Sequence, residues 1–155
     1  MHIAVLDDNI ADRKQIERLL DRESDRRIST SGNLYTDTFG AVDAFLSAPR
    51  QYDFFMIDMK GGVSESIEIA HKIRELGIKV PICFFRSKNE FAGMESMPEN
   101  VLFLEKPVKV AELSAVIDEV IALFEEHKDE YKCEEKDETP EVKKNVFRRI
   151  FEYFY

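Results

Sequence analysis

Short apolar runs alternate with helix-type patterns along residues 1–125, and this alternation constrains the fold more than any other feature of the chain. It is typical of a parallel sheet whose two faces are both covered by helices. The apolar runs predict five strands, at residues 3–6, 34–38, 54–57, 80–85 and 101–104, of which the run at 34–38 is weaker than the others. A chain of 155 residues has room for one domain of ordinary size. We therefore expect an α/β fold with a doubly wound, five-stranded parallel sheet.

Helix patterns fill the intervals between these runs. The clearest one follows the fifth run, where apolar residues recur at steps of three and four from Leu113 to Phe124. Weaker patterns follow the first three runs, around residues 16–20, 41–46 and 69–76, the last of them ending at Leu76. Gly93 and Pro98 disfavour a regular helix between residues 88 and 100, so we expect only a short or frayed helix there.

Charge and cysteine content exclude several classes of protein. There are 31 acidic and 22 basic residues, and the resulting net charge of −9 opposes binding to nucleic acid. No apolar stretch approaches the roughly 20 residues of a membrane span, and the first residues lack a signal-peptide pattern, so a cytoplasmic protein without stable membrane insertion is expected. Cys83 and Cys133 are too far apart to suggest a disulfide framework or a zinc site, and we expect reduced thiols.

The sequence changes character after residue 125. Residues 126–141 are strongly acidic and predict a linker or a solvated extension of the preceding helix. Residues 142–155 predict a short basic amphipathic helix, because Val142, Val146, Ile150 and Phe154 recur at a spacing of four. Such a helix packs most often on its own domain, but dimerisation, a partner protein and, last in rank, an anionic membrane stay open.

Charged residues follow three of the predicted strands. Asp7 and Asp8 come after the first apolar run, Asp58 after the third, and Lys106 just after the fifth. Because the carboxyl ends of parallel strands meet at one edge of a sheet, we expect three carboxylates and one amine to gather there. Each residue has an ordinary interpretation as well: Asp8, with Asn9, as a helix cap, Asp58 as a loop residue, and Lys106 as a turn residue before a proline.

Three nearby carboxylates repel one another, which raises the proton affinity of at least one of them unless a cation compensates. Mg²⁺ prefers oxygen ligands and commonly takes one or two carboxylates together with phosphate oxygens. A carboxylate left free to attack can then accept a phosphoryl group and form an acyl phosphate. The metal and the amine would together neutralise the charge of the group in transit.

Three stretches resemble the receiver domain of two-component response regulators. They are Ile-Ala-Val-Leu-Asp-Asp-Asn at 3–9, Tyr-Asp-Phe-Phe-Met-Ile-Asp-Met at 52–59 and Phe-Leu-Glu-Lys-Pro at 103–107, and the resemblance covers residues 1–125. It implies the flavodoxin-like receiver fold. It further implies phosphorylation of Asp58 by a histidine kinase or a histidine phosphotransfer protein, contact between Lys106 and the phosphoryl group, and a cis bond between Lys106 and Pro107. The Mg²⁺ ligands implied are Asp7, Asp8, Asp58 and the main-chain carbonyl of Lys60.

The chain departs from the receiver pattern in two places. Gly62 and Ser66 stand where most receivers have proline and glycine, which predicts a more mobile loop after Asp58. Arg86 stands where receivers usually have a serine or threonine that binds the phosphoryl group. Ser87 can replace that hydroxyl only if the strand end is shifted or bulged. Otherwise Arg86 itself binds phosphate or pairs with Asp58 beforehand.

A second feature of the switch region is Phe103, which occupies the position of a switching aromatic residue in many receivers. We expect a stand-alone receiver that signals through a downstream protein, because the roughly 30 residues after the last receiver helix are too few for an output domain. The alternatives are a pseudo-receiver that works without phosphate and, less favoured, a Mg²⁺-dependent phosphohydrolase with Asp58 or Asp7 as nucleophile. The sequence shows no second general acid or base for that reaction, and it leaves the oligomeric state open.

Overall fold

The computed structural model describes residues 1–58, 63–87 and 96–131. Within them the five predicted strands form one parallel sheet in the order β2-β1-β3-β4-β5. The strands are β1 (His2–Leu6), β2 (Tyr35–Phe39), β3 (Phe54–Asp58), β4 (Ile82–Arg86) and β5 (Val101–Glu105). Each begins and ends within two residues of its predicted run, so the prediction of a five-stranded parallel sheet is confirmed.

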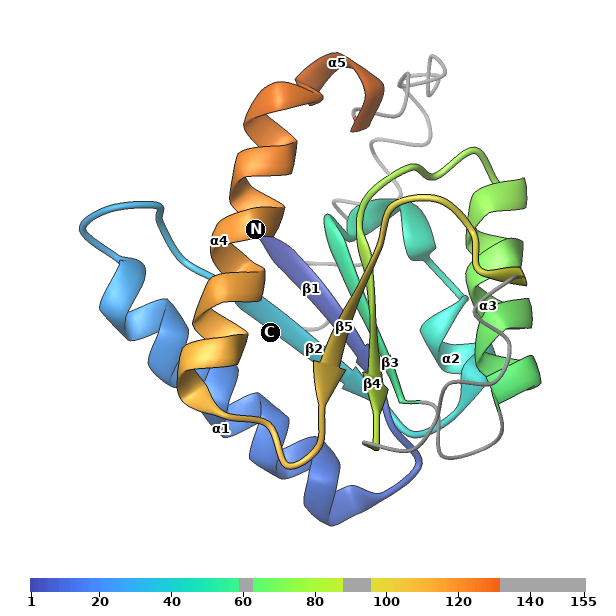
Figure 1. The fold of residues 1–155 in the computed structure, drawn as a ribbon, viewed down its shortest axis with the longest axis horizontal. Helices are drawn as coiled ribbons and strands as arrows, with labels where there is room; N and C mark the ends of the chain where they lie inside the picture. The colour runs from blue at the N-terminus through green and yellow to red at the C-terminus, as the bar shows by residue number, and fades with distance from the viewer. Residues whose placement is uncertain (59–62, 88–95, 132–155) are drawn as a thin grey trace, which may run out of the picture.

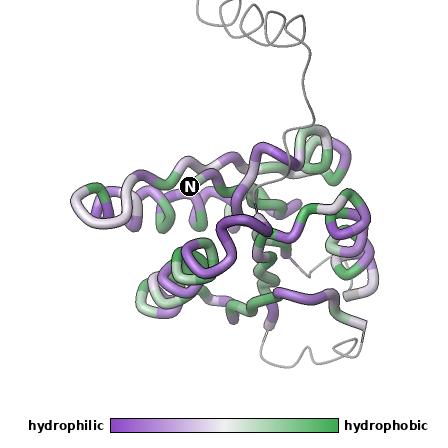
Figure 2. The backbone as a smooth tube through the Cα atoms, turned by 90° about the horizontal axis from the view of Figure 1, so that it is seen from above, coloured by the Kyte–Doolittle hydropathy of each residue, from purple (hydrophilic) through white to green (hydrophobic). Residues whose placement is uncertain are grey.

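Helices cover both faces of the sheet, as the alternating pattern predicts. They are α1 (Ile10–Arg27), α2 (Val42–Phe45), α3 (Val63–Glu75), α4 (Val110–Glu126) and α5 (Lys128–Tyr131), with a 3-10 turn, η1 (Pro49–Gln51). In Figure 1, α1 and α4 lie on one side of the strands and α2 and α3 on the other. Figure 2 shows that hydrophilic and hydrophobic residues alternate along these helices. The doubly wound α/β fold is therefore confirmed.

Two details of the helix predictions differ in the structure. Leu76 was expected on the apolar face of the third helix, but α3 ends at Glu75 and the Leu76 side chain is 44% exposed. The reason is that Gly77, two residues after the end of α3, takes a positive φ of 78°, a conformation that ends helices readily. Most of the segment from 88 to 100, where a frayed helix was expected, lies outside the described residues.

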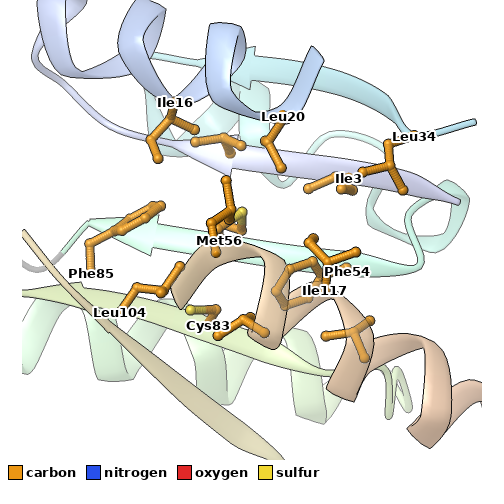
Figure 3. Close-up of a cluster of buried hydrophobic side chains, with 14 residues drawn as sticks. Ile3, Ile16, Leu20, Leu34, Phe54, Met56, Cys83, Phe85, Leu104 and Ile117 are labelled. Carbon is orange, nitrogen blue, oxygen red and sulfur yellow. The ribbon is translucent and has the colours of Figure 1, made fainter. Parts of the chain in front are cut away.

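A hydrophobic core fills the space between the sheet and the helices α1 and α4 (Figure 3). Helix α1 contributes Ile16 and Leu20, and α4 contributes Leu113, Ile117 and Val120, all almost fully buried. The strands contribute alternate residues, among them Ile3, Val5, Phe54, Met56, Cys83, Phe85 and Leu104. We call this the α1/α4 core. It buries the Cys83 thiol, which is free as expected.

A second core, the α2/α3 core, lies on the opposite face of the sheet. The strands contribute the other half of their residues to it, including Phe55, Ile57 and Phe84. Tyr52 and Phe45 pack edge-to-face against Phe55, with ring centroids 5.9 and 5.6 Å apart. Because successive residues of β1, β3 and β4 face one core or the other, these strands read as continuous apolar runs rather than as alternating ones.

A buried ion-pair network ties α1 to α4 across the edge of the α1/α4 core. Glu23 is 1% exposed and accepts a hydrogen bond from Arg27 at 3.0 Å. Arg27 also donates to Asp118 at 2.6 Å and to both oxygens of Ser114 at 3.0 Å. Arg26 pairs with Glu23 as well. The negative charge of Glu23 is thus balanced by two arginines of its own helix, α1, and one of them, Arg27, also binds residues of α4.

The described chain ends beside the amino-terminal ends of β4 and β5. The ring of Tyr131 in α5 packs edge-to-face against Phe124 of α4, and its hydroxyl accepts a hydrogen bond from Asn100 at 2.9 Å. The predicted acidic linker beyond this point and the predicted basic helix at 142–155 lie outside the described residues, as does Cys133. No described helix combines the length and apolar character that crossing a membrane requires.

Candidate functional site

The candidate site lies at the carboxyl ends of β1 and β3, the central strands of the sheet. The chain runs from β1 outward to β2 and then returns to β3, from which it continues in the other direction. Such a reversal leaves a crevice at the strand ends, where open α/β sheets bind their ligands. Leu6 pairs with Ile57 at the ends of these strands, so Asp7 and Asp58 follow neighbouring positions. The fold therefore brings together carboxylates that lie 51 positions apart in the sequence.

Asp7, Asp8 and Asp58 form the predicted cluster. One carboxylate oxygen from each lies within 4.8 Å of the others. Asp7 is 1% exposed and the Asp58 side chain 5%, whereas Asp8 is exposed to solvent. Two of the three carboxylates are therefore largely shielded from solvent, and the third faces it.

The turn that follows β1 fixes the orientation of Asp7. Its Oδ1 accepts a hydrogen bond from the main-chain N–H of Asn9 at 2.9 Å, and its main-chain carbonyl accepts one from Arg13 at 3.0 Å. Asn9 caps α1, accepting bonds from the N–H groups of Ala11 and Asp12 at 3.0 and 3.1 Å. Asn9 thus caps the helix through its own side chain, and the exposed carboxylate of Asp8 stays beside those of Asp7 and Asp58.

Lys106 reaches into this cluster from the loop after β5. Its Nζ lies 2.9 Å from Asp7 Oδ2 and 3.3 Å from Asp58 Oδ1. Burial by itself lowers the pKa of the ammonium group, but the bond to Asp7 and the charges of Asp58 and Asp7 outweigh it and raise the pKa above its ordinary value. Lys106 is thus a firmly charged cation. The peptide bond between Lys106 and Pro107 is cis, as the resemblance implies.

Two contacts at the site were not predicted from the sequence. Asp12, in the first turn of α1, accepts a hydrogen bond from Lys106 Nζ at 3.3 Å. Ser66 is 3% exposed, and its hydroxyl donates to the main-chain carbonyl of Asp58 at 2.9 Å, which ties α3 to the end of β3. The start of α1 at residue 10 is the signal that would have found Asp12, because a helix there turns this side chain toward the strand ends.

Arg86 is the last residue of β4. The β4–β5 ladder runs without interruption from Ile82–Val101 to Arg86–Glu105, so the strand end is neither shifted nor bulged. The condition under which Ser87 would replace the usual hydroxyl is therefore not met. The guanidinium carbon of Arg86 lies 4.5 Å from the centroid of the Phe103 ring, a cation–π contact on the outer strands of the sheet.

Comparison with known proteins identifies the fold. No protein-family model matches the chain, and no curated protein matches it. Among solved structures it is similar to a response regulator receiver protein from Burkholderia phymatum, with 21% identity, a TM-score of 0.57 and coverage of 78% of this chain and 94% of that one. It is also similar to a response regulator receiver domain protein from Clostridium thermocellum, with 19% identity, a TM-score of 0.64 and coverage of 80% of this chain and 96% of that one. A third similar structure is a CheY-like receiver domain from Methylobacillus flagellatus, with 16% identity, a TM-score of 0.61 and coverage of 77% of this chain and 98% of that one. This chain has the receiver fold.

The donor set of the receiver-fold site fits a magnesium ion. Octahedral Mg²⁺ holds oxygen ligands at about 2.1 Å, which places opposite ligands about 4.2 Å apart. The spread of at most 4.8 Å among the oxygens of Asp7, Asp8 and Asp58 is close to that value. The three ligands are hard carboxylate oxygens, and Asp8 faces solvent, which leaves room for the waters that Mg²⁺ retains. Lys60, whose carbonyl the resemblance adds to this set, lies outside the described residues.

Proposed function

We propose that this protein is a phosphoacceptor of two-component signalling, phosphorylated on Asp58 by a histidine kinase or a histidine phosphotransfer protein. The observation that supports it most is the contact of Lys106 with Asp7 and Asp58 at the rim of a receiver-fold sheet. The phosphorylated domain then signals by binding a downstream protein in the cytoplasm. In this proposal it is a signalling module rather than an enzyme with its own substrate.

The chemical step is a transfer of the phosphoryl group from nitrogen to oxygen. An oxygen of the Asp58 carboxylate attacks the phosphorus of the donor's phosphohistidine, a P–O bond forms, and the P–N bond breaks. The electron pair of that bond stays on the imidazole nitrogen, which takes up a proton. With a small donor such as acetyl phosphate, acetate leaves instead.

The residues around Asp58 have separate roles in this step. Asp7, Asp8 and Asp58, with the main-chain carbonyl of Lys60, would hold Mg²⁺, which supplies positive charge beside the phosphoryl oxygens. Lys106 supplies a fixed ammonium group, already 3.3 Å from Asp58, so little reorganisation precedes transfer. Its raised pKa keeps it charged throughout the physiological range.

The test is incubation with acetyl phosphate and Mg²⁺, read by intact mass. We expect the wild-type protein to gain one phosphoryl group and Asp58→Asn to gain none. Asp43→Asn, which removes an exposed carboxylate on α2, is the matched control and keeps the reaction. A wild-type protein that stays unmodified, under conditions in which another receiver is modified, contradicts the proposal.

The presence of Arg86 favours one rival, a pseudo-receiver that binds its partner whether or not Asp58 is modified. A guanidinium at this place can supply positive charge near Asp58 without any phosphate. The rival predicts that wild type and Asp58→Asn bind the downstream partner with equal affinity in the presence of the phosphoryl donor. Our proposal predicts that only the wild-type affinity changes.

A further inference from the structure

The main chain at the end of β1 is held from two sides. The N–H of Asp7 donates a hydrogen bond to the carbonyl of Phe39, the last residue of β2, at 3.0 Å. The carbonyl of Asp7 accepts one from Nη1 of Arg13, near the start of α1, also at 3.0 Å. Because both bonds involve backbone atoms of Asp7, they fix the course of the chain where it enters the candidate site.

Asp8 depends on this anchor more than Asp7 does. The carboxylate of Asp7 has bonds of its own, from the N–H of Asn9 and from Lys106. Asp8 is exposed, and the part of the chain that the structure describes offers no hydrogen bond or ion pair to its side chain. The carbonyl of Asp7 and the N–H of Asp8 belong to one planar peptide group. A bond to that carbonyl therefore fixes the plane from which the Asp8 side chain starts.

Gly40 gives Arg13 the room to reach Asp7. Gly40 directly follows β2, and a Cβ atom added to it would overlap Nη1 of Arg13 and lie 3.2 Å from Cζ. The φ angle of Gly40 is not in the left-handed region that favours glycine; the described glycines with such an angle are Gly32 and Gly77. Space, and not backbone conformation, therefore calls for glycine at position 40.

We propose that Arg13 is a positioning residue of the candidate site, and that Gly40 is required because the guanidinium lies against it. Arg13 orients the Asp7–Asp8 peptide group, and through it the two carboxylates that would hold Mg²⁺ from the end of β1. The inference rests on the proposed function, in which these carboxylates are metal ligands. Replacing a residue that bonds to a metal ligand commonly lowers metal affinity by about 10- to 100-fold.

The charge of Arg13 alone predicts the opposite effect. A guanidinium near three carboxylates offsets part of the negative charge that attracts a divalent cation. Removing only that charge would therefore tighten the binding of Mg²⁺, whereas the loss of an oriented ligand would weaken it. The direction of the change in affinity thus separates a positioning role from a purely electrostatic one.

The first test measures the dissociation constant for Mg²⁺ by a titration followed with NMR. We expect Arg13→Met to bind Mg²⁺ about tenfold more weakly than wild type. Gly40→Ala keeps the charge but displaces the guanidinium, so we expect a similar loss. In the double variant the methyl group has no guanidinium to displace, and the loss should be no greater than in Arg13→Met. Arg18→Met, which removes an exposed arginine of the same helix, is the matched control.

The second test uses the metal-free protein. The carbon resonance of the Asp7 carbonyl and the nitrogen resonance of the Asp8 amide both depend on the hydrogen bond to that carbonyl. We expect Arg13→Met and Gly40→Ala to shift both resonances in the same direction, and Arg18→Met to leave them unchanged. Gly40→Ala carries both tests if Arg13→Met fails to fold.

Three results would overturn the inference. One is Arg13→Met binding Mg²⁺ as tightly as wild type, or more tightly. Another is Gly40→Ala with the carbonyl resonance and the Mg²⁺ affinity of wild type. The third is a double variant in which the two losses add, which would mean that Gly40 does not act through Arg13.

The outcome for the wild-type protein separates this inference from the proposed function. If wild type binds no Mg²⁺ and accepts no phosphoryl group, the proposed function fails together with the inference. If wild type does both and only the Arg13 and Gly40 tests fail, the proposed function stands alone.

Discussion

The Nζ of Lys106 lies 2.9 Å from Oδ2 of Asp7, although 99 positions separate the two residues in the chain. The same amine lies 3.3 Å from Oδ1 of Asp58, the last residue of β3. The contact joins the loop after β5 to the central strands of the sheet. It sets a charged amine beside the proposed phosphoacceptor before any phosphate arrives, and it makes Lys106 the first residue to test.

Removing the amine should slow phosphorylation of Asp58. We expect Lys106→Gln to lower the rate of transfer from acetyl phosphate by about 10²-fold, the usual effect of losing one charge-stabilising donor. Lys106→Arg should also be impaired, because a bulky fork replaces a compact charge. The measurement is the time course of the mass increase. Lys109→Gln, which changes a side chain that is 72% exposed, is the control. A wild-type rate in Lys106→Arg would contradict the assigned role.

Neutralising Asp8 should affect the metal-free protein and the metal-bound protein in opposite ways. Without Mg²⁺, Asp8→Asn removes repulsion among three carboxylates and should raise the melting temperature slightly. With Mg²⁺ it removes one ligand, so the gain in melting temperature on adding the metal should be smaller than in wild type. Thermal unfolding with and without Mg²⁺ measures both effects, and Asp43→Asn is the control. Equal Mg²⁺-induced gains in wild type and Asp8→Asn would exclude Asp8 as a ligand.

The hydroxyl of Tyr52 should make stability depend on pH at the alkaline end. Burial, reinforced by a hydrogen bond to Asp37 at 2.8 Å, raises its pKa to about 12. A tyrosine in the unfolded chain has a pKa of about 10. The folded state therefore holds the proton more tightly, so this contribution to stability is complete below about pH 10 and is lost as the pH rises to about 12.

Denaturant unfolding across that pH range tests the role of Tyr52. We expect Tyr52→Phe to show a smaller fall in the free energy of unfolding between about pH 10 and about pH 12 than wild type. Tyr35→Phe, at a side chain that is 53% exposed, controls for the replacement of a tyrosine in general. An identical alkaline fall in wild type and Tyr52→Phe would contradict the prediction.

The network between α1 and α4 should stabilise the fold through Arg27. Arg27→Met removes one of the two arginines that pair with the buried carboxylate of Glu23 and leaves only Arg26. We expect this substitution to lower the free energy of unfolding by about 3 kcal/mol. Asp118 is 68% exposed, so Asp118→Asn should cost less than about 1 kcal/mol. Urea unfolding of both variants compares the two. Similar losses in both would show that burial of Glu23 is not the cause.

Four of the five strands were predictable because each contains a continuous apolar run, whereas β2, with the sequence Tyr-Thr-Asp-Thr-Phe, gives a weaker signal. A strand that is buried on both faces is apolar at every position, so the ends of the apolar run mark the ends of the strand to within two residues. The positions of the strand ends were sufficient to predict that Asp7, Asp58 and Lys106 lie at the same edge of the sheet. The cis bond before Pro107 was implied only by the resemblance.

The contacts that sequence patterns did not reveal depend on where helices begin and which way long side chains turn. Asp12 meets Lys106 because α1 begins at residue 10 and carries this side chain in its first turn, a contact that the weak apolar pattern of α1 does not encode. The stacking of Arg86 on Phe103 depends on rotamers at the ends of two strands, which no periodicity encodes. Leu76 was misplaced because the Gly77 conformation that ends α3 was not recognised.

The most direct test of the central claim is to locate the phosphoryl group on the chain. After reaction with acetyl phosphate and Mg²⁺, reduction with borohydride converts an aspartyl phosphate to homoserine, and peptide mass spectrometry finds the altered residue. The account predicts homoserine at position 58 and at no other aspartate. Homoserine at position 7, or at no position, would contradict it.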